Sequence, residues 1–263
     1  MPAVPVQFIS SRDNPLLKDL RRLAQDTAAY RRQGQLWAEG DHLCRAALLR
    51  GWHPNTAVFS ESFWPLTRAE WTQCATKNIV IPDALFAGIS GLVSPAAMGF
   101  IIDLPADVGV QAQAPTVILD RVQDAGNVGA ILRSAAAFGF TQVIALKGTA
   151  ALWSPKVLRA GMGAHFGLTL LDGADPGVLE ALDVPVLVTS SHAGLALHQL
   201  LRQAGLPMPC AWVFGHEGQG VGGPLAGRAQ LQVRIAQPGG EESLNVAGAA
   251  AICLHASATA ALA

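Results

Sequence analysis

Several features that would assign this chain to a common class of protein are missing from its sequence. Only 14% of the 263 residues are charged and the formal net charge is −1, so composition alone does not indicate a polyanionic partner. No run of 18 apolar residues is uninterrupted, which makes a membrane-spanning helix unexpected. The opening MPAVPV lacks a basic region followed by an apolar run. We therefore expect neither a membrane anchor nor a secretory signal.

The cysteines and histidines form no metal-binding pattern. The four cysteines lie far apart at positions 44, 74, 210 and 253 and include no C-x-x-C pair, so neither a zinc site nor a disulfide framework is indicated. The seven histidines show no metal spacing, and His216-Glu217 does not continue to H-E-x-x-H. We expect no metal and a reducing, cytoplasmic location.

What the chain does have is apolar residues, 51% of the total, enough to bury a core in one large or two ordinary domains. Periodicity in the first hundred residues predicts a small α/β unit. Its expected helices begin at Pro15 and cover 41–49, 64–75 and 83–87, and its expected strands cover 56–59, 78–81 and 98–104. We assign residues 1–105 to this first domain and 106–115, a proline-bounded stretch, to a linker.

Residues 116–263 alternate strands with helices, the pattern of a mostly parallel sheet covered by helices on both faces. The expected strands are 116–120, 142–146, 168–171, 184–190, 211–214 and 231–235. The expected helices are 128–138, 156–161, 178–182, 195–204 and 244–260.

The first stretch that could carry chemistry follows the strand ending at Asp120. A loop opens a helix that Asn127 could cap, and Val128 begins an apolar stripe at i, i+3, i+4 and i+7. Arg133 is rotated roughly 140° from Val128, at about 100° per residue. It points off the stripe toward the strand ends, where ligands bind in such sheets. An ordinary exposed helix arginine would have the same pattern.

The second stretch is V-F-G-H-E-G-Q-G-V, residues 213–221. Its glycines allow a ligand close to the backbone, and Glu217 could pair with Arg133 or hold a polar ligand group. A solvated acid in a surface turn is the alternative. Neither stretch contains G-x-G-x-x-G or a P-loop, so nucleotide-phosphate binding is weakly supported.

The third stretch, residues 233–251, runs from a strand through Pro238-Gly239-Gly240 into two acids and an alanine-rich helix. Ser243 and Asn245 are favoured at such a helix start. Beside a glycine-rich turn they could form a ligand site, although an ordinary capped turn would contain the same residues.

Basic residues are concentrated in the first fifty residues, eight against five acids. Arg12, Arg31 and Arg32 are therefore candidates for RNA-backbone contacts, and Lys156 and Arg159, three apart on one helix, could also meet phosphates. Solvated helix faces would have the same composition.

Taken together, these residues resemble the SpoU-type RNA 2′-O-ribose methyltransferases of the SPOUT superfamily. Asn127 and Arg133 have the spacing of the first family motif, residues 215–220 match the second, and 235–246 match the third, with E-S-L-N-V intact at 242–246. The segment P-K-x-x-R-A at 155–160 is also similar. Residues 10–52, with S-x-x-N-P, Arg31-Arg32 and Glu39-Gly40, resemble the substrate-binding domain often fused in front. Ala236-Gln237 depart from the usual Pro-Met, and Gly161 stands where serine is common.

The resemblance implies an α/β fold with a C-terminal trefoil knot, preceded by an L30e-like RNA-binding domain. It also implies a homodimer with the active site completed across the interface. S-adenosylmethionine would bind in the knot, and the implied cofactor-binding residues are Thr189, Gly215, Gly220, Ile235 and Leu244. The implied catalytic residues are Asn127, Arg133, Glu217, Ser243 and Asn245, and the expected substrate is ribosomal RNA.

Methyl transfer to a ribose hydroxyl requires carbon and oxygen to be held about 3–3.5 Å apart. Family proposals give the arginine a role in activating the hydroxyl, but a guanidinium almost never loses its proton. We therefore expect Arg133 to bind the neighbouring phosphate and stabilise the developing alkoxide. Ser243 and Asn245 would orient the ribose and the methionine end of the cofactor, and Glu217 and Asn127 would hold Arg133 and the loop.

Three alternatives remain open from the sequence. They are a tRNA 2′-O-methyltransferase, an inactive RNA-binding module of the same fold, and a nucleotide-dependent oxidoreductase. The missing G-x-G-x-x-G turn counts against the oxidoreductase.

Overall fold

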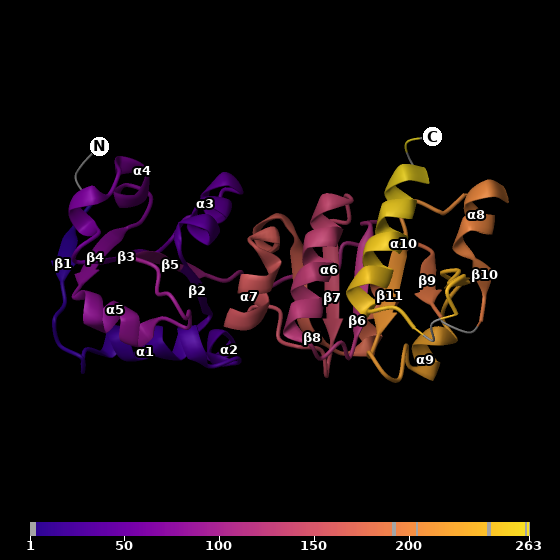
Figure 1. Ribbon diagram of the computed structural model, residues 1–263, viewed down its shortest axis with the longest axis horizontal. Coiled ribbons are helices and arrows are strands. Elements are labelled where there is room, and N and C mark those ends of the chain that lie inside the picture. The colour runs from indigo at the N-terminus through magenta and orange to yellow at the C-terminus, as the bar shows by residue number, and fades with distance from the viewer. Residues whose placement is uncertain (1–3, 191–192, 204, 241–242, 261, 263) are drawn as a thin grey trace. The chain divides into compact units, whose positions relative to one another are not determined.

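The computed structural model describes residues 4–190, 193–203, 205–240, 243–260 and 262 (Figure 1). Contacts divide the chain into two units. Unit 1 comprises residues 1–107 and 153–166, and unit 2 comprises 108–152 and 167–263. The functional division at 105 and 115 remains a prediction. Within the described residues no helix is long and apolar enough to cross a membrane.

Unit 1 is built on a five-stranded mixed sheet in the order β1-β4-β3-β5-β2. Its strands are β1 (Val6–Phe8), β2 (Gln35–Glu39), β3 (Thr56–Ser60), β4 (Lys77–Ile81) and β5 (Met98–Asp103). Its helices are α1 (Pro15–Gln25), α2 (Ala29–Gln33), α3 (Asp41–Leu49), η1 (Trp64–Leu66), α4 (Ala69–Thr72), α5 (Asp83–Ile89), α7 (Pro155–Gly161) and η2 (Ala164–Gly167), the last ending one residue inside unit 2.

Local signals explain the helices that the sequence predicted in unit 1. Asn14 caps α1 by accepting a hydrogen bond from the Leu16 N–H at 2.9 Å, and Pro15 occupies the first helical position. The helix predicted over 64–75 is wrong as a single element. The Thr67 hydroxyl donates to the Trp64 carbonyl at 2.7 Å and so competes with helical pairing between η1 and α4.

Unit 2 contains the predicted parallel sheet, with seven strands in the order β10-β12-β9-β11-β6-β7-β8 and parallel pairing throughout. Its strands are β6 (Thr116–Asp120), β7 (Gln142–Leu146), β8 (Thr169–Ala174), β9 (Val186–Thr189), β10 (Leu195–Ala196), β11 (Ala211–Gly215) and β12 (Leu231–Arg234). Its helices are α6 (Ala125–Ala137), η3 (Pro176–Ala181), α8 (Leu197–Gln203), α9 (Gly223–Ala226) and α10 (Val246–Ala260).

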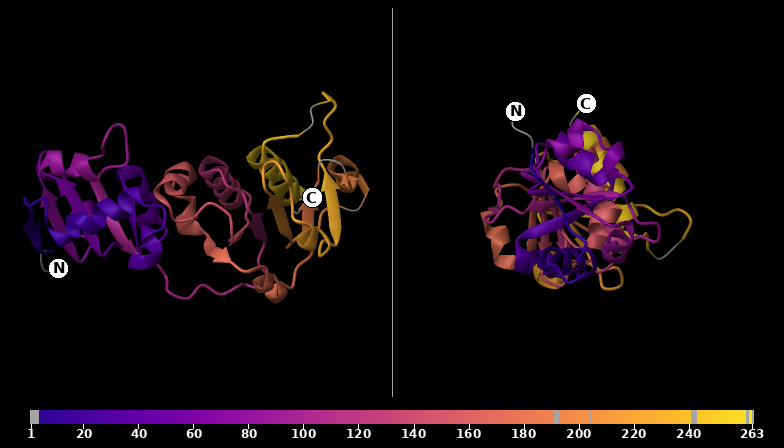
Figure 2. Two further views of the ribbon diagram at one scale, coloured as in Figure 1. Left: turned by 90° about the horizontal axis from the view of Figure 1, so that it is seen from below. Right: turned by 90° about the vertical axis from the view of Figure 1, so that its left-hand side faces the viewer.

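Both faces of this sheet are covered, as alternation along each strand requires. The helices α6 and α10 lie side by side over one face (Figure 1), where the Trp212 indole N–H of β11 donates to the Ser257 hydroxyl of α10 at 2.9 Å. The neighbouring Val213 points to the other face and packs with Leu179 of η3 and Leu225 of α9. Figure 2, left, shows η3 on the side of the sheet away from α6 and α10.

The order of the strands determines where a ligand can enter. From β6 the chain moves outward through β7 to β8, whereas β11 and β9 lie on the other side of β6. The carboxyl ends of β6 and β11 therefore flank a point where the direction of winding reverses, and ligands bind at such points.

The buried Trp212–Ser257 hydrogen bond gives a test of how α10 is held on the sheet. Both side chains are fully buried. Ser257→Ala leaves the indole N–H without a partner and should lower the free energy of unfolding by about 1–3 kcal/mol. Chemical denaturation measures this effect.

The matched control is Ser134→Ala, because this half-buried hydroxyl donates to a carbonyl of its own helix, that of Ala130, at 3.1 Å. It should change the free energy of unfolding by less than about 0.5 kcal/mol. Equal losses in the two variants would contradict a role for the buried hydrogen bond.

Candidate active site

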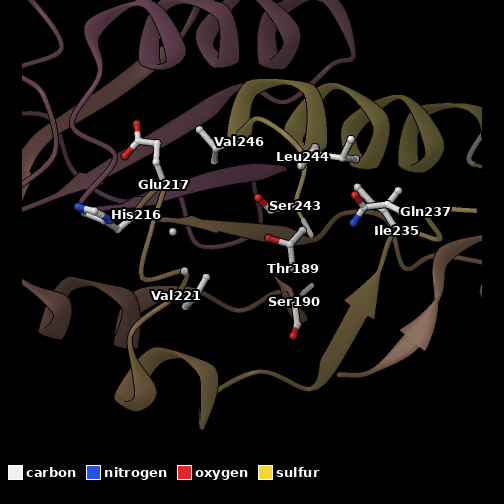
Figure 3. Close-up of a pocket in the computed structure, with 13 residues that line it drawn as sticks. Thr189, Ser190, His216, Glu217, Val221, Ile235, Gln237, Ser243, Leu244 and Val246 are labelled. Carbon is white, nitrogen blue, oxygen red and sulfur yellow. The ribbon is translucent and has the colours of Figure 1, made fainter. Parts of the chain in front are cut away.

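A cavity of about 120 Å³ lies at the carboxyl ends of β9, β11 and β12 (Figure 3). It adjoins a more polar hollow of about 840 Å³ that shares much of its wall. The lining residues of the first cavity are Thr189, Ser190, Gly215, His216, Glu217, Gly220, Val221, Ile235, Gln237, Ser243, Leu244, Val246 and Ala249. The second and third motifs, far apart in sequence, thus meet at one edge of the sheet.

The loop after β11 forms a tight turn that exposes its backbone to this cavity. The Gly220 N–H donates to the His216 carbonyl at 2.8 Å, and the His216 Nδ1 accepts the N–H groups of Gly218 and Gln219 at 3.0 and 3.2 Å. A side chain at Gly215 would come within 2.2 Å of the Gly220 carbonyl carbon. Glycine is therefore required at 215 by close approach, and Gly220 adopts φ +65°.

The segment before α10 forms the facing wall. Asn245 caps α10, since its Oδ1 accepts the N–H groups of Ala247 and Gly248 at 2.9 and 3.3 Å. Ser243 and Leu244, just before this cap, line the cavity. The two acids at 241 and 242 lie outside the described residues.

Asn245 also connects the third motif to the first two. Its Nδ2 donates to Asn127 Oδ1 at 3.0 Å, and Asn127 Nδ2 donates to Glu217 Oε1 at 3.1 Å. Glu217 further accepts the N–H groups of Gln123 and Asp124 at 3.3 and 3.2 Å. One hydrogen-bonded chain therefore joins the three loops, and its member Glu217 lines the cavity.

These donors stabilise the ionised form of the Glu217 carboxylate. Partial burial on its own raises the pKa of Glu217. Hydrogen bonds from its own backbone and from Asn127, Asp124 and Gln123 outweigh that effect and hold the pKa below its usual value. At neutral pH the loops are thus joined by an anion.

All five residues predicted to bind the cofactor line the cavity: Thr189, Gly215, Gly220, Ile235 and Leu244. Of the predicted catalytic residues, Ser243 and Glu217 line it, and Asn127 and Asn245 are connected to Glu217 by hydrogen bonds. Their roles in binding and catalysis remain predictions.

Arg133 is placed differently from what the sequence suggested. It is exposed on α6, off the buried stripe as expected, but it does not line the cavity. Within the described residues it forms no ion pair with Glu217, whose carboxylate is taken up by Asn127 and the two backbone donors. The expected pairing of Glu217 with Arg133 is therefore wrong.

The cap of α6 is a second correction. The helix begins at Ala125, and Asp124 caps it by accepting the Asn127 N–H at 2.7 Å. Asn127 is thus inside the first turn, where its amide is free to bridge Asn245 and Glu217.

Sequence reasoning missed several lining residues, namely Ser190, His216, Val221, Gln237, Val246 and Ala249. Position after a strand could have indicated Ser190, which directly follows β9. Gln237 stands where the family usually has methionine. Its Oε1 is buried and, within the described part of the chain, has no hydrogen-bond partner.

The five candidate RNA-binding residues all fall in unit 1. Arg12, Arg31 and Arg32 precede residue 107, and Lys156 and Arg159 lie in α7, which joins this unit although it lies between β7 and β8 in sequence. Arg32 forms an ion pair with Asp26, whereas Lys156 is exposed. Contact with RNA remains a prediction. No group of three metal-ligating side chains occurs among the described residues.

Comparison with known proteins agrees with this arrangement. Residues 114–255 match the family model described as SpoU rRNA Methylase family. An uncharacterized tRNA/rRNA methyltransferase of Synechocystis is 32% identical over 95% of this chain and 93% of its own length. The 23S rRNA (guanosine(2553)-2′-O)-methyltransferase RlmP of Bacillus subtilis is 28% identical over 94% of this chain and 97% of its own.

A solved structure extends the similarity to both units. The AdoMet-bound rRNA methyltransferase from Sinorhizobium meliloti superposes with a TM-score of 0.80 at 27% identity, covering 96% of this chain and 97% of that one. The family match covers more than half of the chain, including all three motifs and the cavity they form, and the chain therefore belongs to the SpoU rRNA methylase family.

Proposed function

We propose that this protein transfers a methyl group from S-adenosylmethionine to a ribose 2′-hydroxyl in ribosomal RNA. The observation that carries this proposal is the meeting of the second and third motifs around one cavity, to which Asn127 of the first motif is joined by the hydrogen-bonded chain Asn245–Asn127–Glu217. The Bacillus relative, which covers nearly the whole chain, is a 23S rRNA 2′-O-methyltransferase.

The residues that line the cavity suit the cofactor chemically. Ile235, Leu244 and Val246 provide apolar walls for a flat base, and Gly215 lets the backbone approach closely. The unpaired Oε1 of Gln237 requires a donor, because a buried acceptor without one is unfavourable. S-adenosylmethionine carries amino groups that can donate, and when bound it supplies a methyl group on a sulfonium.

The residues of the chain would position the hydroxyl and balance the charge that develops on it. Ser243 lies in the cavity wall and can orient the ribose, while Asn245 is held by Asn127 and by the start of α10. Arg133 forms no ion pair within the described residues, so its guanidinium is available to bind a phosphate next to the target ribose.

Unit 1 would hold the RNA, since its predicted contacts Arg12, Arg31, Arg32, Lys156 and Arg159 belong to one compact body. A cytoplasmic location is consistent with the cysteines, all four of which are free. The trefoil knot also remains a prediction. It is supported by the insertion of β11 between β6 and β9 and of β12 between β9 and β10.

The reaction and the role of Arg133 can be tested together. The purified chain should transfer labelled methyl groups to unmodified ribosomal RNA, at a ribose hydroxyl located by resistance to alkaline cleavage. Arg133→Lys keeps the charge but loses bidentate phosphate binding, so the rate should fall by roughly 10- to 100-fold. Cofactor affinity, measured by calorimetry, should be unchanged.

Arg228→Lys is the matched control, because Arg228 pairs with Glu180 away from the cavity. It should keep the wild-type rate. Full activity of Arg133→Lys would exclude the phosphate role. Transfer to transfer RNA alone would assign another substrate, and cofactor binding without any transfer would indicate an inactive module.

Gln237 provides a test of the cofactor site that is independent of catalysis. Replacing Gln237 by leucine removes the unpaired acceptor. The free protein should become no less stable, and by up to about 1 kcal/mol more stable. Cofactor binding should weaken by roughly tenfold, since the donor on the ligand then has no partner. Thermal unfolding and calorimetry measure the two effects.

Gln203→Leu, on the exposed face of α8 outside the cavity, is the control and should leave affinity unchanged. If Gln237→Leu bound the cofactor as tightly as wild type, the side-chain carbonyl of Gln237 would have no role in binding.

We also propose a homodimer, based on an apolar groove beside the cavity. The groove is lined by Phe138, Leu197, His198, Leu201, Ile235, Ala236, Ala251, Ile252, His255, Ala256 and Thr259. Leu201 and Ile252 are 40% and 42% exposed, and a contiguous apolar patch of this kind typically marks an interface. Ile235 lines both groove and cavity, so a second copy seated here would border the active site.

Ile252→Glu places a charge in this groove and should convert a dimer to a monomer, because burial of an unpaired carboxylate is strongly unfavourable. Light scattering coupled to size exclusion measures the mass. Leu66→Glu, at a more exposed apolar position in unit 1, should leave the mass unchanged. A dimer that persists in Ile252→Glu would place the interface elsewhere.

A further inference from the structure

An arginine at the end of β6 adopts a backbone conformation that its side chain disfavours. Arg121 has φ +59°, and within the described residues Met162 is the only other non-glycine residue with positive φ. Residues with a Cβ rarely occupy this region. Such outliers persist where surrounding contacts enforce them, and they cluster at functional sites.

The contacts that enforce this conformation are specific. The Arg121 N–H donates to the Thr149 hydroxyl at 3.1 Å, and that hydroxyl donates to the Leu119 carbonyl at 3.0 Å. The guanidinium donates two hydrogen bonds to the Asp120 carboxylate, from Nε at 2.9 Å and from Nη2 at 3.0 Å. Its third donor, Nη1, reaches Gln219 Oε1 at 2.9 Å.

Asp120 completes a bridge to the other side of the loop. Asp120 is 5% exposed, and its carboxylate accepts the Gly222 N–H at 2.7 Å. Burial raises the pKa of Asp120, but the hydrogen bonds from Arg121 and Gly222 outweigh it and hold the pKa below its usual value. The pair therefore remains ionised at neutral pH.

Neighbouring glycines leave the room that the arginine needs. A Cβ at Gly148 would lie 3.0 Å from the Arg121 Cγ, and one at Gly222 would lie 3.3 Å from Nη2. The guanidinium thus lies in a fitted slot between two loops.

The segment held by this arrangement is the wall of the cofactor cavity. Arg121 contacts Gln219 and, through Asp120, Gly222, while the two residues between them, Gly220 and Val221, line the cavity. We propose that Arg121 is a positioning residue that clamps residues 219–222 in the form that accepts the cofactor. The inference rests on the proposed function for the identity of that cofactor.

The clamp can be separated from general stability, because glycine is the residue that tolerates φ +59° best. Arg121→Gly relieves the backbone and removes the guanidinium. We expect a folded protein whose affinity for S-adenosylmethionine, measured by calorimetry, falls by about tenfold, as expected for loss of charge-assisted hydrogen bonds. In the free protein the Gly222 amide should exchange with solvent faster. Arg121→Lys should show a smaller loss of affinity and a smaller increase in Gly222 exchange than Arg121→Gly.

Met162→Gly is the matched control, since Met162 has φ +50° and ends α7 outside the cavity. It relieves the same kind of backbone conformation and should leave affinity and Gly222 exchange unchanged. A loss of affinity in this control would attribute the effect to backbone relief and contradict the clamp.

Gln219→Ala provides a second variant at an exposed position, so it should not impair folding. If the clamp acts through Gln219, the effects of Arg121→Gly and Gln219→Ala will not add in a double-mutant cycle. Additive effects, wild-type affinity in Arg121→Gly, or unchanged Gly222 exchange would each overturn the proposal. A wild-type chain that binds no S-adenosylmethionine would instead contradict the proposed function, and Gly222 exchange would still test the clamp.

Discussion

One carboxylate holds the active-site edge of this protein together. Glu217 lies in the loop after β11 and accepts N–H groups from Gln123, Asp124 and Asn127, all at the start of the crossover after β6. Asn127 then accepts from Asn245 at the start of α10. The carboxyl ends of parallel strands lie at the same edge of a sheet, so the loops that follow β6, β11 and β12 lie close together there. Hydrogen bonding to one anion turns that proximity into a defined site.

The same edge contrasts satisfied and unsatisfied polar groups. Glu217, Asp120 and Arg121 have their hydrogen-bonding partners within the protein, and they set the positions of loops. Gln237 Oε1 is buried and unpaired within the described chain, and Arg133 is exposed with no ion pair there. A buried polar group without a partner is unfavourable in the free protein and favourable once a ligand supplies one. This division separates groups that shape the cavity from Gln237 and Arg133, for which we propose contacts with the cofactor and with RNA.

At this edge of the sheet, glycines make room for close backbone contacts and for the side chain of Arg121. Gly215 permits the backbone of the β11 loop to close on itself, and Gly148 and Gly222 make room for the Arg121 guanidinium. The left-handed conformation of Arg121 is stabilised by hydrogen bonds to Thr149 and to Gln219 in the loop after β11. At Gly215 and Gly220 the wall of the cavity is therefore formed by backbone.

Local sequence signals account for the parallel α/β architecture of residues 116–263, because strand and helix patterns alternate clearly along this stretch. The resemblance to the SpoU-type family indicated five residues for cofactor binding, and all five line the cavity. Which groups form hydrogen bonds with each other could be read only from the tertiary structure. Glu217 bonds to Asn127 and backbone N–H groups rather than to Arg133, Asp124 rather than Asn127 caps α6, and α7 joins unit 1 although it lies between β7 and β8. The reason is physical: periodicity shows which face of an element is buried, whereas hydrogen-bond partners depend on which loops meet in space, and that is set by strand order.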